Sequence, residues 1–243
     1  MKVKLILLTF LTLINSILAL NVSLNSNDIN LDFQNSIKLS LENVKESTHA
    51  YEIEIYKVKK DKLGKDIKVE SNTENDFLII PNQILIMPNG SEEVIISYLG
   101  DKNIEKEENY RILVKEIDLN LNEEDPEVIL RKIETSSIAS FKFLTNYVKS
   151  FYINKKDWKH KINIEEKKLN QNNLTIVVKN TGKKRLINGG DHPRLKYLIK
   201  SKSGETFSFS SKILTLLAND IFEEILELPT DINIEDINIE YKF

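Results

Sequence analysis

The sequence of 243 residues has no cysteine, only seven glycines and only five prolines. Without cysteine there is no disulfide and no thiol nucleophile, so the chain has to rely on its hydrophobic core for stability. So few glycines and prolines argue against long flexible linkers. The three histidines, His49, His160 and His192, are far apart in the sequence and lack the spacing of a metal site. We therefore predict no metal and no cofactor.

An excess of one charge is also missing. The 34 basic and 37 acidic residues are interspersed and give a formal net charge of −3. A nucleic-acid-binding protein would show a basic block or stripe, and none is present. The chain also lacks a Gly-x-Ser-x-Gly elbow and a phosphate-binding loop. Asp191-His192-Pro193 after Gly189-Gly190 is typical of a turn. These absences predict neither a nucleic-acid partner nor an enzyme.

The first nineteen residues have the pattern of a secretory signal peptide. Lys2 and Lys4 precede an apolar run from Leu5 to Leu13, and Ala19 offers a small residue at a cleavage point. An uncleaved membrane anchor is the alternative, but the run is shorter than the roughly 20 residues that a span needs. No second apolar run of that length follows, so we predict a mature protein that is soluble outside the cytoplasm.

Short segments with apolar residues at every second position follow the signal peptide. This period is typical of half-buried strands, and turn residues such as Pro88-Asn89-Gly90 separate them. We predict a β-sandwich over residues 20–153. Its expected strands are Asn21–Leu24, Ile29–Phe33, Ile37–Leu41, Tyr51–Val58, Phe77–Ile80, Ile84–Met87, Val94–Tyr98 and Tyr110–Ile117.

A second unit is expected over residues 154–243, after a polar joint at Lys155–Asp157. About 90 residues with strand patterns suit a second small sandwich. The predicted fold class is therefore all-β with two sandwich domains. The expected strands of the second domain are Ile162–Ile164, Leu174–Val178, Leu195–Ile199, Phe207–Phe209, Ile213–Leu217, Ile221–Leu228 and Ile232–Phe243.

The most informative segment is one long predicted strand, Ile138–Ile153, which follows an acidic segment, Asp118–Ser137, expected to be an exposed loop. Successive side chains of a strand point to opposite faces. One face of this strand is apolar apart from Thr145. We expect the strand to keep a free edge for a partner, although its phenylalanines could instead be ordinary core residues. The apolar face carries Ala139, Phe141, Phe143 and Tyr147.

Three stretches in this order resemble the periplasmic chaperones of the chaperone-usher pilus pathway. Ile80–Ile96 is similar to the family's proline-led entry, apolar strand, Pro/Gly turn and following strand. Tyr110–Ile117 is similar to its strand of the type aromatic-Arg-x-x-x-Lys/Arg-Glu-Ile/Val. Asn180-Thr-Gly182, with His192 and Arg194 shortly after it, resembles the second domain of the archaic, spore-coat-like branch.

The resemblance implies two immunoglobulin-like domains, a periplasmic location, and pilus subunits and an outer-membrane usher as partners. It implies that the strand donates Ala139, Phe141, Phe143 and Tyr147 to a subunit that lacks one strand, by β-strand addition. It also implies that Lys149 holds the subunit's C-terminal carboxylate. The arginine that the family pairs with this lysine is missing from the first strand, where Asn27 or Asp28 stands. The alternatives are that Lys149 acts alone, that it acts with Arg111 or another basic residue, or that the anchoring differs in this branch.

Two other functions are compatible with the same sequence. The first is a secreted two-domain adhesin or pilus structural component whose strands are all satisfied within the assembly. The second is an exported enzyme on a sandwich scaffold, against which the lack of any acid, base or nucleophile constellation argues.

Overall fold

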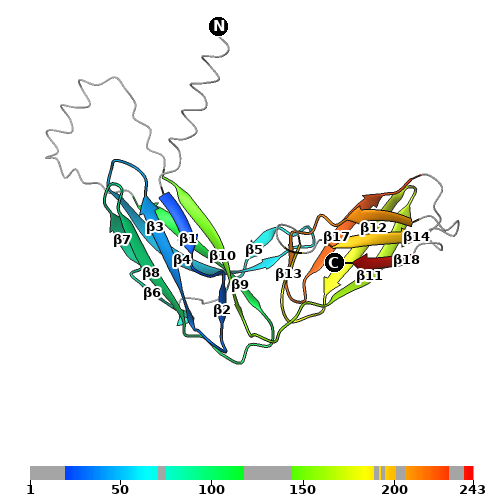
Figure 1. Cartoon of the computed structure of the whole chain (residues 1–243), viewed down its shortest axis with the longest axis horizontal. Coiled ribbons are helices and arrows are strands. Elements are labelled where there is room, and N and C mark those ends of the chain that lie inside the picture. Colours follow the sequence, from blue (N-terminus) through cyan, green and yellow to red (C-terminus); the bar gives the residue numbers. More distant parts are fainter. Residues whose placement is uncertain are drawn as a thin grey trace, which may run out of the picture.

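The structure, a computed structural model, describes residues 20–70, 75–117, 144–188, 192, 195–200, 206–229 and 238–242. Within these ranges every regular element is a β-strand. Figure 1 shows the strands gathered in two lobes along the long axis of the molecule. The predicted all-β fold is therefore confirmed.

The first lobe is a sandwich of two sheets. One sheet has the antiparallel order β1 (Leu20–Leu24), β3 (Ser36–Asn43), β8 (Ser91–Tyr98) and β6 (Phe77–Ile80). The other has the order β2 (Asp28–Asn30), β10 (Asn146–Asn154), β9 (Glu108–Ile117), β4 (His49–Lys60) and β5 (Asp66–Lys68), and β7 (Gln83–Ile86) also pairs with β4.

The alternation seen in the sequence becomes the core between these two sheets. On β3, Ile37, Leu39 and Leu41 are buried, whereas the residues between them are more exposed. At the centre, the ring of Phe77 lies 4.9 Å from the ring of Tyr110 and 5.5 Å from that of Phe151, both edge to face. Aromatic pairs of this geometry add about 1 kcal/mol each to the burial of their surface.

The second lobe has its own core. One sheet consists of β11 (Ile162–Asn170), β12 (Asn173–Asn180) and β17 (Ile221–Glu227), and another of β15 (Thr206–Ser210), β14 (Lys196–Lys200) and β18 (Asn238–Lys242). The short strands β13 (Leu186–Ile187) and β16 (Thr215–Leu216) pair with each other. Ile176 and Val178 of β12 share this core with Tyr197 and Ile199 of β14.

The two cores fall on either side of the segment that joins β10 to β11. The first core ends with Ile153 and the second begins with Ile162. The domain limits expected from the sequence, 20–153 and 154–243, stay predictions. The signal peptide and the loop at Asp118–Ser137 lie outside the described residues.

Several predicted strands are shorter than expected. Of the strand predicted at Ile138–Ile153, the described part begins only at Asn146, after Leu144 and Thr145. β2 ends at Asn30, because the Asn30 side chain accepts the Asp32 N–H and its carbonyl accepts the Phe33 N–H, which turns the chain. Phe33 is consequently 68% exposed. In the expected strand Ile213–Leu217 only Thr215–Leu216 pairs. The turn predicted at Pro88–Gly90 is present, with the Gly90 N–H donating to the Met87 carbonyl.

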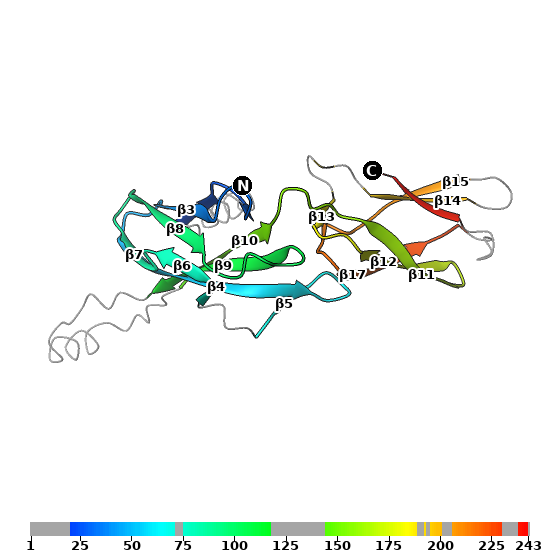
Figure 2. The same ribbon diagram turned by 90° about the horizontal axis from the view of Figure 1, so that it is seen from below.

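A hairpin that the sequence analysis did not predict connects the two lobes. It consists of the end of β4 and the short strand β5, which pair from Val58↔Lys68 to Lys60↔Asp66. Figures 1 and 2 show it extending from the first lobe toward the second. There the Glu223 N–H of β17 donates to the Lys62 carbonyl at 3.0 Å.

Candidate functional site

One edge of β10 is only partly paired. On one side β10 pairs antiparallel with β9 up to its last residue but one, from Asn146↔Lys115 to Ile153↔Glu108. On its other side it pairs with β2 over three residues only, from Tyr152 to Asn154. Among the described residues, no strand pairs with this outer edge between Asn146 and Phe151.

Two backbone hydrogen bonds show which groups this edge presents. The Thr145 carbonyl accepts the Glu116 N–H of β9, whereas the Tyr152 N–H donates to the Asn27 carbonyl on the β2 side. Since the direction of backbone groups alternates along a strand, the N–H and C=O groups of even-numbered residues point outward. The outer edge therefore offers those of Asn146, Val148 and Ser150, a template for pairing with another strand.

The two faces of β10 differ in burial. Phe151 and Ile153 are fully buried in the first core, and Tyr147, on the same face, packs against it while remaining partly exposed. On the opposite face Val148 is 51% exposed. The strand is thus anchored on one face and accessible on the other.

Glu116 fixes the point at which β10 begins. One carboxylate oxygen accepts the Thr145 N–H at 2.9 Å, and the other lies 2.7 Å from His49 Nδ1. His49 Nε2 is in turn 2.8 Å from Ser47 Oγ. This is the contact order of a Ser-His-Glu triad, but a triad also needs donors for an oxyanion. Because the carboxylate is shared with the backbone of Thr145, we assign it to holding the strand.

A cleft of about 470 Å³ lies where the two sandwiches meet. Arg111 of β9 is its most buried cation. Its Nε and Nη2 both donate to Asp66 Oδ2, at 2.8 and 2.5 Å, and its Nη1 donates to Asn109 Oδ1. Residues from both lobes line the cleft, among them Lys60, Arg111, Ser150, Tyr152, Lys212, Thr215 and Phe222.

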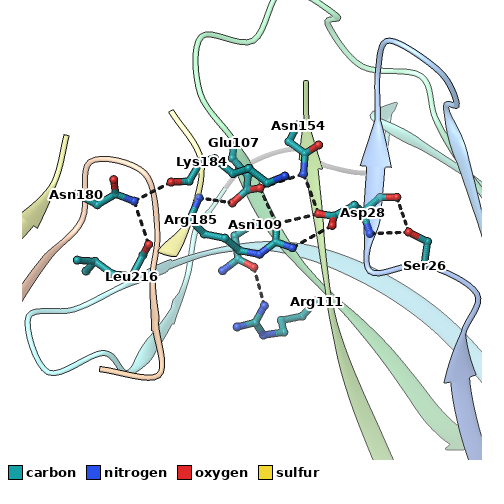
Figure 3. Close-up of polar contacts among 10 residues, drawn as sticks. All are labelled: Ser26, Asp28, Glu107, Asn109, Arg111, Asn154, Asn180, Lys184, Arg185 and Leu216. Atoms are coloured by element: carbon teal, nitrogen blue, oxygen red, sulfur yellow. Dashed lines mark hydrogen bonds and ion pairs between the residues drawn. The ribbon is translucent and has the colours of Figure 1, made fainter. Parts of the chain in front are cut away.

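A buried ion network joins the lobes next to β10 (Figure 3). Arg185 Nη1 donates to Asp28 Oδ1 at 2.8 Å and to Glu107 Oε2 at 2.5 Å. The Arg185 N–H also donates to Glu107, and Asn154 Nδ2 donates to both carboxylates. The guanidinium lies 3.6 Å from the centre of the Tyr152 ring. Every charge of the network has a partner, as a buried charge requires.

Burial and pairing act in opposite directions on the charges of this network. Burial raises the pKa of the Glu107 carboxyl, and the neighbouring Arg185 only partly opposes this effect. Burial disfavours the charge of Arg185, but the hydrogen bond to Asp28 and the charge of Glu107 outweigh it and raise its pKa. Arg185 therefore stays charged, and Glu107 depends on it to remain ionised.

Another pocket, of about 820 Å³, adjoins the network. It brings together His160 and His192, which the sequence analysis treated as unrelated. Burial lowers the pKa of His160, and the charge of Lys184 adds to this effect. In the part of the chain that the structure describes, no three His, Asp or Glu side chains are placed to hold a metal ion. Nor do these residues include a helix long and apolar enough to cross a membrane.

Comparison with known sequences gives no relative. No protein-family model matches the chain, and no curated protein matches it.

Solved structures do share its architecture. A chain from a chaperone–tip adhesin complex, described as vital for synergistic activation of CFA/I fimbriae biogenesis, has a TM-score of 0.58 at 14% identity and covers 91% of this chain and 98% of its own. The class 5 fimbriae chaperone CfaA scores 0.54 at 14% identity, covering 92% and 99%. The YadV chaperone scores 0.52 at 10% identity, covering 89% of each chain. The chain has the fold of the fimbrial chaperones. The predicted pair of immunoglobulin-like sandwiches is thereby confirmed.

The chaperone fold gives the predicted site residues a context. Ala139, Phe141 and Phe143 lie outside the described residues, so their role stays a prediction. Tyr147 lies on β10 opposite Val114, partly buried against the first core. Lys149 is half-buried and lies on the same strand face as Tyr147, opposite Ile112.

The chaperone family's first-strand arginine was expected at residue 27 or 28, and residue 28 is an acid, Asp28. Asp28 of β2 accepts hydrogen bonds from Arg185, a residue 157 positions later in the sequence. Asn27 contributes its carbonyl to β10. The cation at this point of the chaperone fold therefore comes from the second lobe, which sequence reasoning missed because nothing local marks Arg185.

Proposed function

We propose that the chain is a non-enzymatic periplasmic chaperone that binds pilus subunits and delivers them to an outer-membrane usher. The observation that carries the proposal is the outer edge of β10, whose backbone groups at Asn146, Val148 and Ser150 have no partner strand among the described residues. The fold shared with fimbrial chaperones supports the same conclusion.

β-Strand addition explains how such an edge would bind a subunit. The partner's strand would form main-chain hydrogen bonds with the edge, and these bonds provide affinity without requiring a particular sequence. Side chains that fill successive pockets of the partner provide specificity. We propose that Ala139, Phe141, Phe143 and Tyr147 are these side chains, and that Lys149 contributes to holding the partner's C-terminal carboxylate.

Val148→Pro tests the edge directly. Proline removes the outward N–H of residue 148 but none of the hydrogen bonds to β9, because those come from the odd-numbered residues. We expect the variant to lose a co-purifying pilus subunit, identified by mass spectrometry, when captured from its native host. Val148→Thr is the matched control, since it keeps the N–H and the β-branched shape, and it should retain the subunit.

A second pair of variants tests the predicted plugs. Phe141→Glu combined with Phe143→Glu should also abolish subunit capture while the protein remains folded. If both the proline variant and this double variant retain the same partners as the unmodified chain, strand donation is wrong. A secreted adhesin or pilus component would then be the better interpretation.

A further inference from the structure

Two lysine-rich segments lie side by side where the chain passes from the first lobe to the second. The N–H groups of Lys183 and Lys184 both donate to the Lys159 carbonyl, at 2.9 and 3.2 Å. The Thr181 N–H donates to the Lys161 carbonyl at 2.7 Å. These bonds gather six exposed or half-buried lysines at the joint between the lobes. We call this surface the joint patch, and its lysines are Lys155, Lys156, Lys159, Lys161, Lys183 and Lys184.

Two aromatic rings lie among these lysines. The ammonium groups of Lys155 and Lys183 are 5.8 and 6.0 Å from the centre of the half-buried Trp158 ring. The Lys156 ammonium is 5.2 Å from the centre of the Phe33 ring, and Phe33 is 68% exposed. Because a ring face attracts a cation, the ammonium groups are held beside the rings. The patch therefore presents positive charge and aromatic surface together.

The joint patch is positively charged, although the whole chain has a formal net charge of −3. Two exposed acids, Asp32 and Asp157, accompany the six lysines. The buried network of Arg185 and its two acids adds one negative charge. The loop 101–106 contributes two acids and two lysines, which cancel. Six lysines less three acids leave an excess of three positive charges.

The lysines of the patch have no anionic partner of their own. None of their ammonium groups forms an ion pair with a residue that the structure describes. The charges that surround Asp220 are those of lysines outside the patch, Lys59, Lys60 and Lys106. A lysine ammonium is a compact point charge without the fixed fork by which arginine recognises one carboxylate. The patch is therefore suited to a surface that carries many anions.

The patch has an accessible position in the molecule. Figure 1 shows the two lobes as the arms of a V, and the joint lies at its vertex. The Lys156 N–H donates to Asp32 Oδ2 at 2.8 Å, which brings the loop with Phe33 to the same place. The pocket of about 820 Å³ adjoins the patch, because Trp158, Lys159 and Lys184 line it. Its acid, Asp28, is already paired with Arg185.

We propose that the joint patch binds the surface of an anionic phospholipid membrane. Lysines near such a surface are attracted by its negative potential, and aromatic side chains favour the level of the headgroups. The six lysines would face lipid phosphates, while Phe33 and Trp158 lie between the headgroups. The inference goes beyond the proposed function, since the patch shares no residue with the free edge of β10 at 146–151.

Trp158 makes the test specific for the site, because it is the only tryptophan of the chain. The exported protein, purified from its native host, is mixed with vesicles of phosphatidylcholine containing about 30% phosphatidylglycerol, or with vesicles of phosphatidylcholine alone. We expect it to float with the anionic vesicles only, and its tryptophan emission to move to shorter wavelength. Both effects should disappear at about 0.5 M NaCl, because salt screens exposed charges.

A triple variant, Lys155→Gln with Lys156→Gln and Lys183→Gln, tests the lysines. It should lower the partition coefficient for anionic vesicles about hundredfold, because each lysine near the surface contributes about a factor of five. The matched control removes the same charge from three exposed lysines outside the patch and should change the coefficient less than about twofold. Circular dichroism verifies that both variants are folded. The control carries Lys65→Gln, Lys167→Gln and Lys196→Gln.

Phe33→Ser separates a membrane from an acidic protein as the partner. It should weaken binding to anionic vesicles about fivefold, because a ring at the headgroup level is lost. Soluble poly-glutamate serves as the probe for an acidic protein. If poly-glutamate binds to the patch and the anionic vesicles do not, the partner is an acidic protein and the inference is wrong.

Three further results would overturn the inference. The first is equal binding to neutral and anionic vesicles, and the second is an equal loss in the two triple variants. The third is an unchanged emission of Trp158 in protein that floats with the vesicles, since another surface would then make the contact. If vesicles do not bind but Val148→Pro still abolishes subunit capture, the proposed function stands and only the inference about the joint patch fails.

Discussion

Arg185 is a buried side chain of the second lobe that pairs with two acids of the first. It is 5% exposed and pairs with Glu107, which is 1% exposed, and with the more accessible Asp28. A buried charge that loses its partner is far more costly than an exposed one. Arg185 thus brings a cation from the second lobe against two acids of the first.

We predict that Arg185→Met lowers the free energy of unfolding by about 3 kcal/mol, because Glu107 remains buried without its partner. Urea denaturation measures this change. Lys38→Met, which breaks an ion pair whose members are 53% and 58% exposed, should cost less than about 0.5 kcal/mol. Adding Glu107→Gln to Arg185→Met should restore part of the loss. Equal effects of Arg185→Met and Lys38→Met would show that the network contributes no more than a surface pair.

Asp66 gives a pH dependence at the same scale. Burial opposes its ionisation, but the hydrogen bond from Lys60 and the charge of Arg111 outweigh burial and hold the pKa of Asp66 below its ordinary value of 3.8. A lowered pKa means that the contribution to stability is complete above 3.8 and is lost as the pH falls below it. We predict that the unmodified chain is about 1 kcal/mol more stable than Asp66→Asn at pH 7, a small value because the group is partly exposed.

This difference should shrink progressively as the pH falls below 3.8. Denaturation of both proteins between about pH 2 and pH 7 measures this difference. A difference that stays constant on acidification would show that the ionised form of Asp66 is not what stabilises the hairpin.

At the scale of elements, the strands were predictable and their contacts were not. Alternation on β3 and β8 is visible in the sequence because one face of each strand is buried. β5 was missed because all three of its residues are exposed and carry no such pattern. The strand expected at Ile29–Phe33 is too long by three residues, because the alternation of apolar residues continues through the turn that Asn30 makes.

The Asn180-Thr-Gly182 turn contains a glycine that its surroundings require. A Cβ on Gly182 would meet backbone atoms of Lys159, His160 and Lys161, which cannot move aside as a side chain could. We predict that Gly182→Ala lowers the free energy of unfolding by about 2 kcal/mol. Thermal unfolding followed by circular dichroism measures it. Thr181→Ala, which removes a hydroxyl bond to the Lys161 carbonyl, is the control and should cost less than half as much. If Gly182→Ala is as stable as the unmodified chain, the turn leaves more room for a Cβ at residue 182 than the structure shows.

At the scale of the whole molecule, the sequence predicted two sandwiches but not how they meet. The bonds between the lobes join residues far apart in the chain, such as Arg185 with Glu107, 78 positions away. No periodic pattern carries such information. The free edge of β10 was predicted from the apolar face of Ile138–Ile153, but the described structure supports it through the backbone pairing of residues 146–154 instead.

The hairpin β4–β5 gives the last prediction, because it should hold the lobes together independently of the ion network. The Glu223 N–H donates to Lys62 and not to β12, since odd-numbered residues of β17 point away from that strand, as the bond from the Leu228 N–H to the Asn172 carbonyl indicates. Glu223→Pro therefore removes a contact between the lobes without removing a bond of its own sheet.

We expect Glu223→Pro to make the lysine-rich joint at 155–161 about threefold more sensitive to trypsin, because looser docking of the lobes allows this segment to open more often. The rate of appearance of the two fragments on a gel measures it, while circular dichroism verifies that both sandwiches remain folded. Glu223→Ala keeps the N–H and removes only the side chain, so it should be cleaved at the rate of the unmodified chain. If the proline and alanine variants are cleaved equally fast, the hairpin rests on the second lobe without holding it, and the other contacts between the lobes, among them the ion network around Arg185 and the bond from the Glu107 N–H to the Lys183 carbonyl, set the arrangement of the two sandwiches.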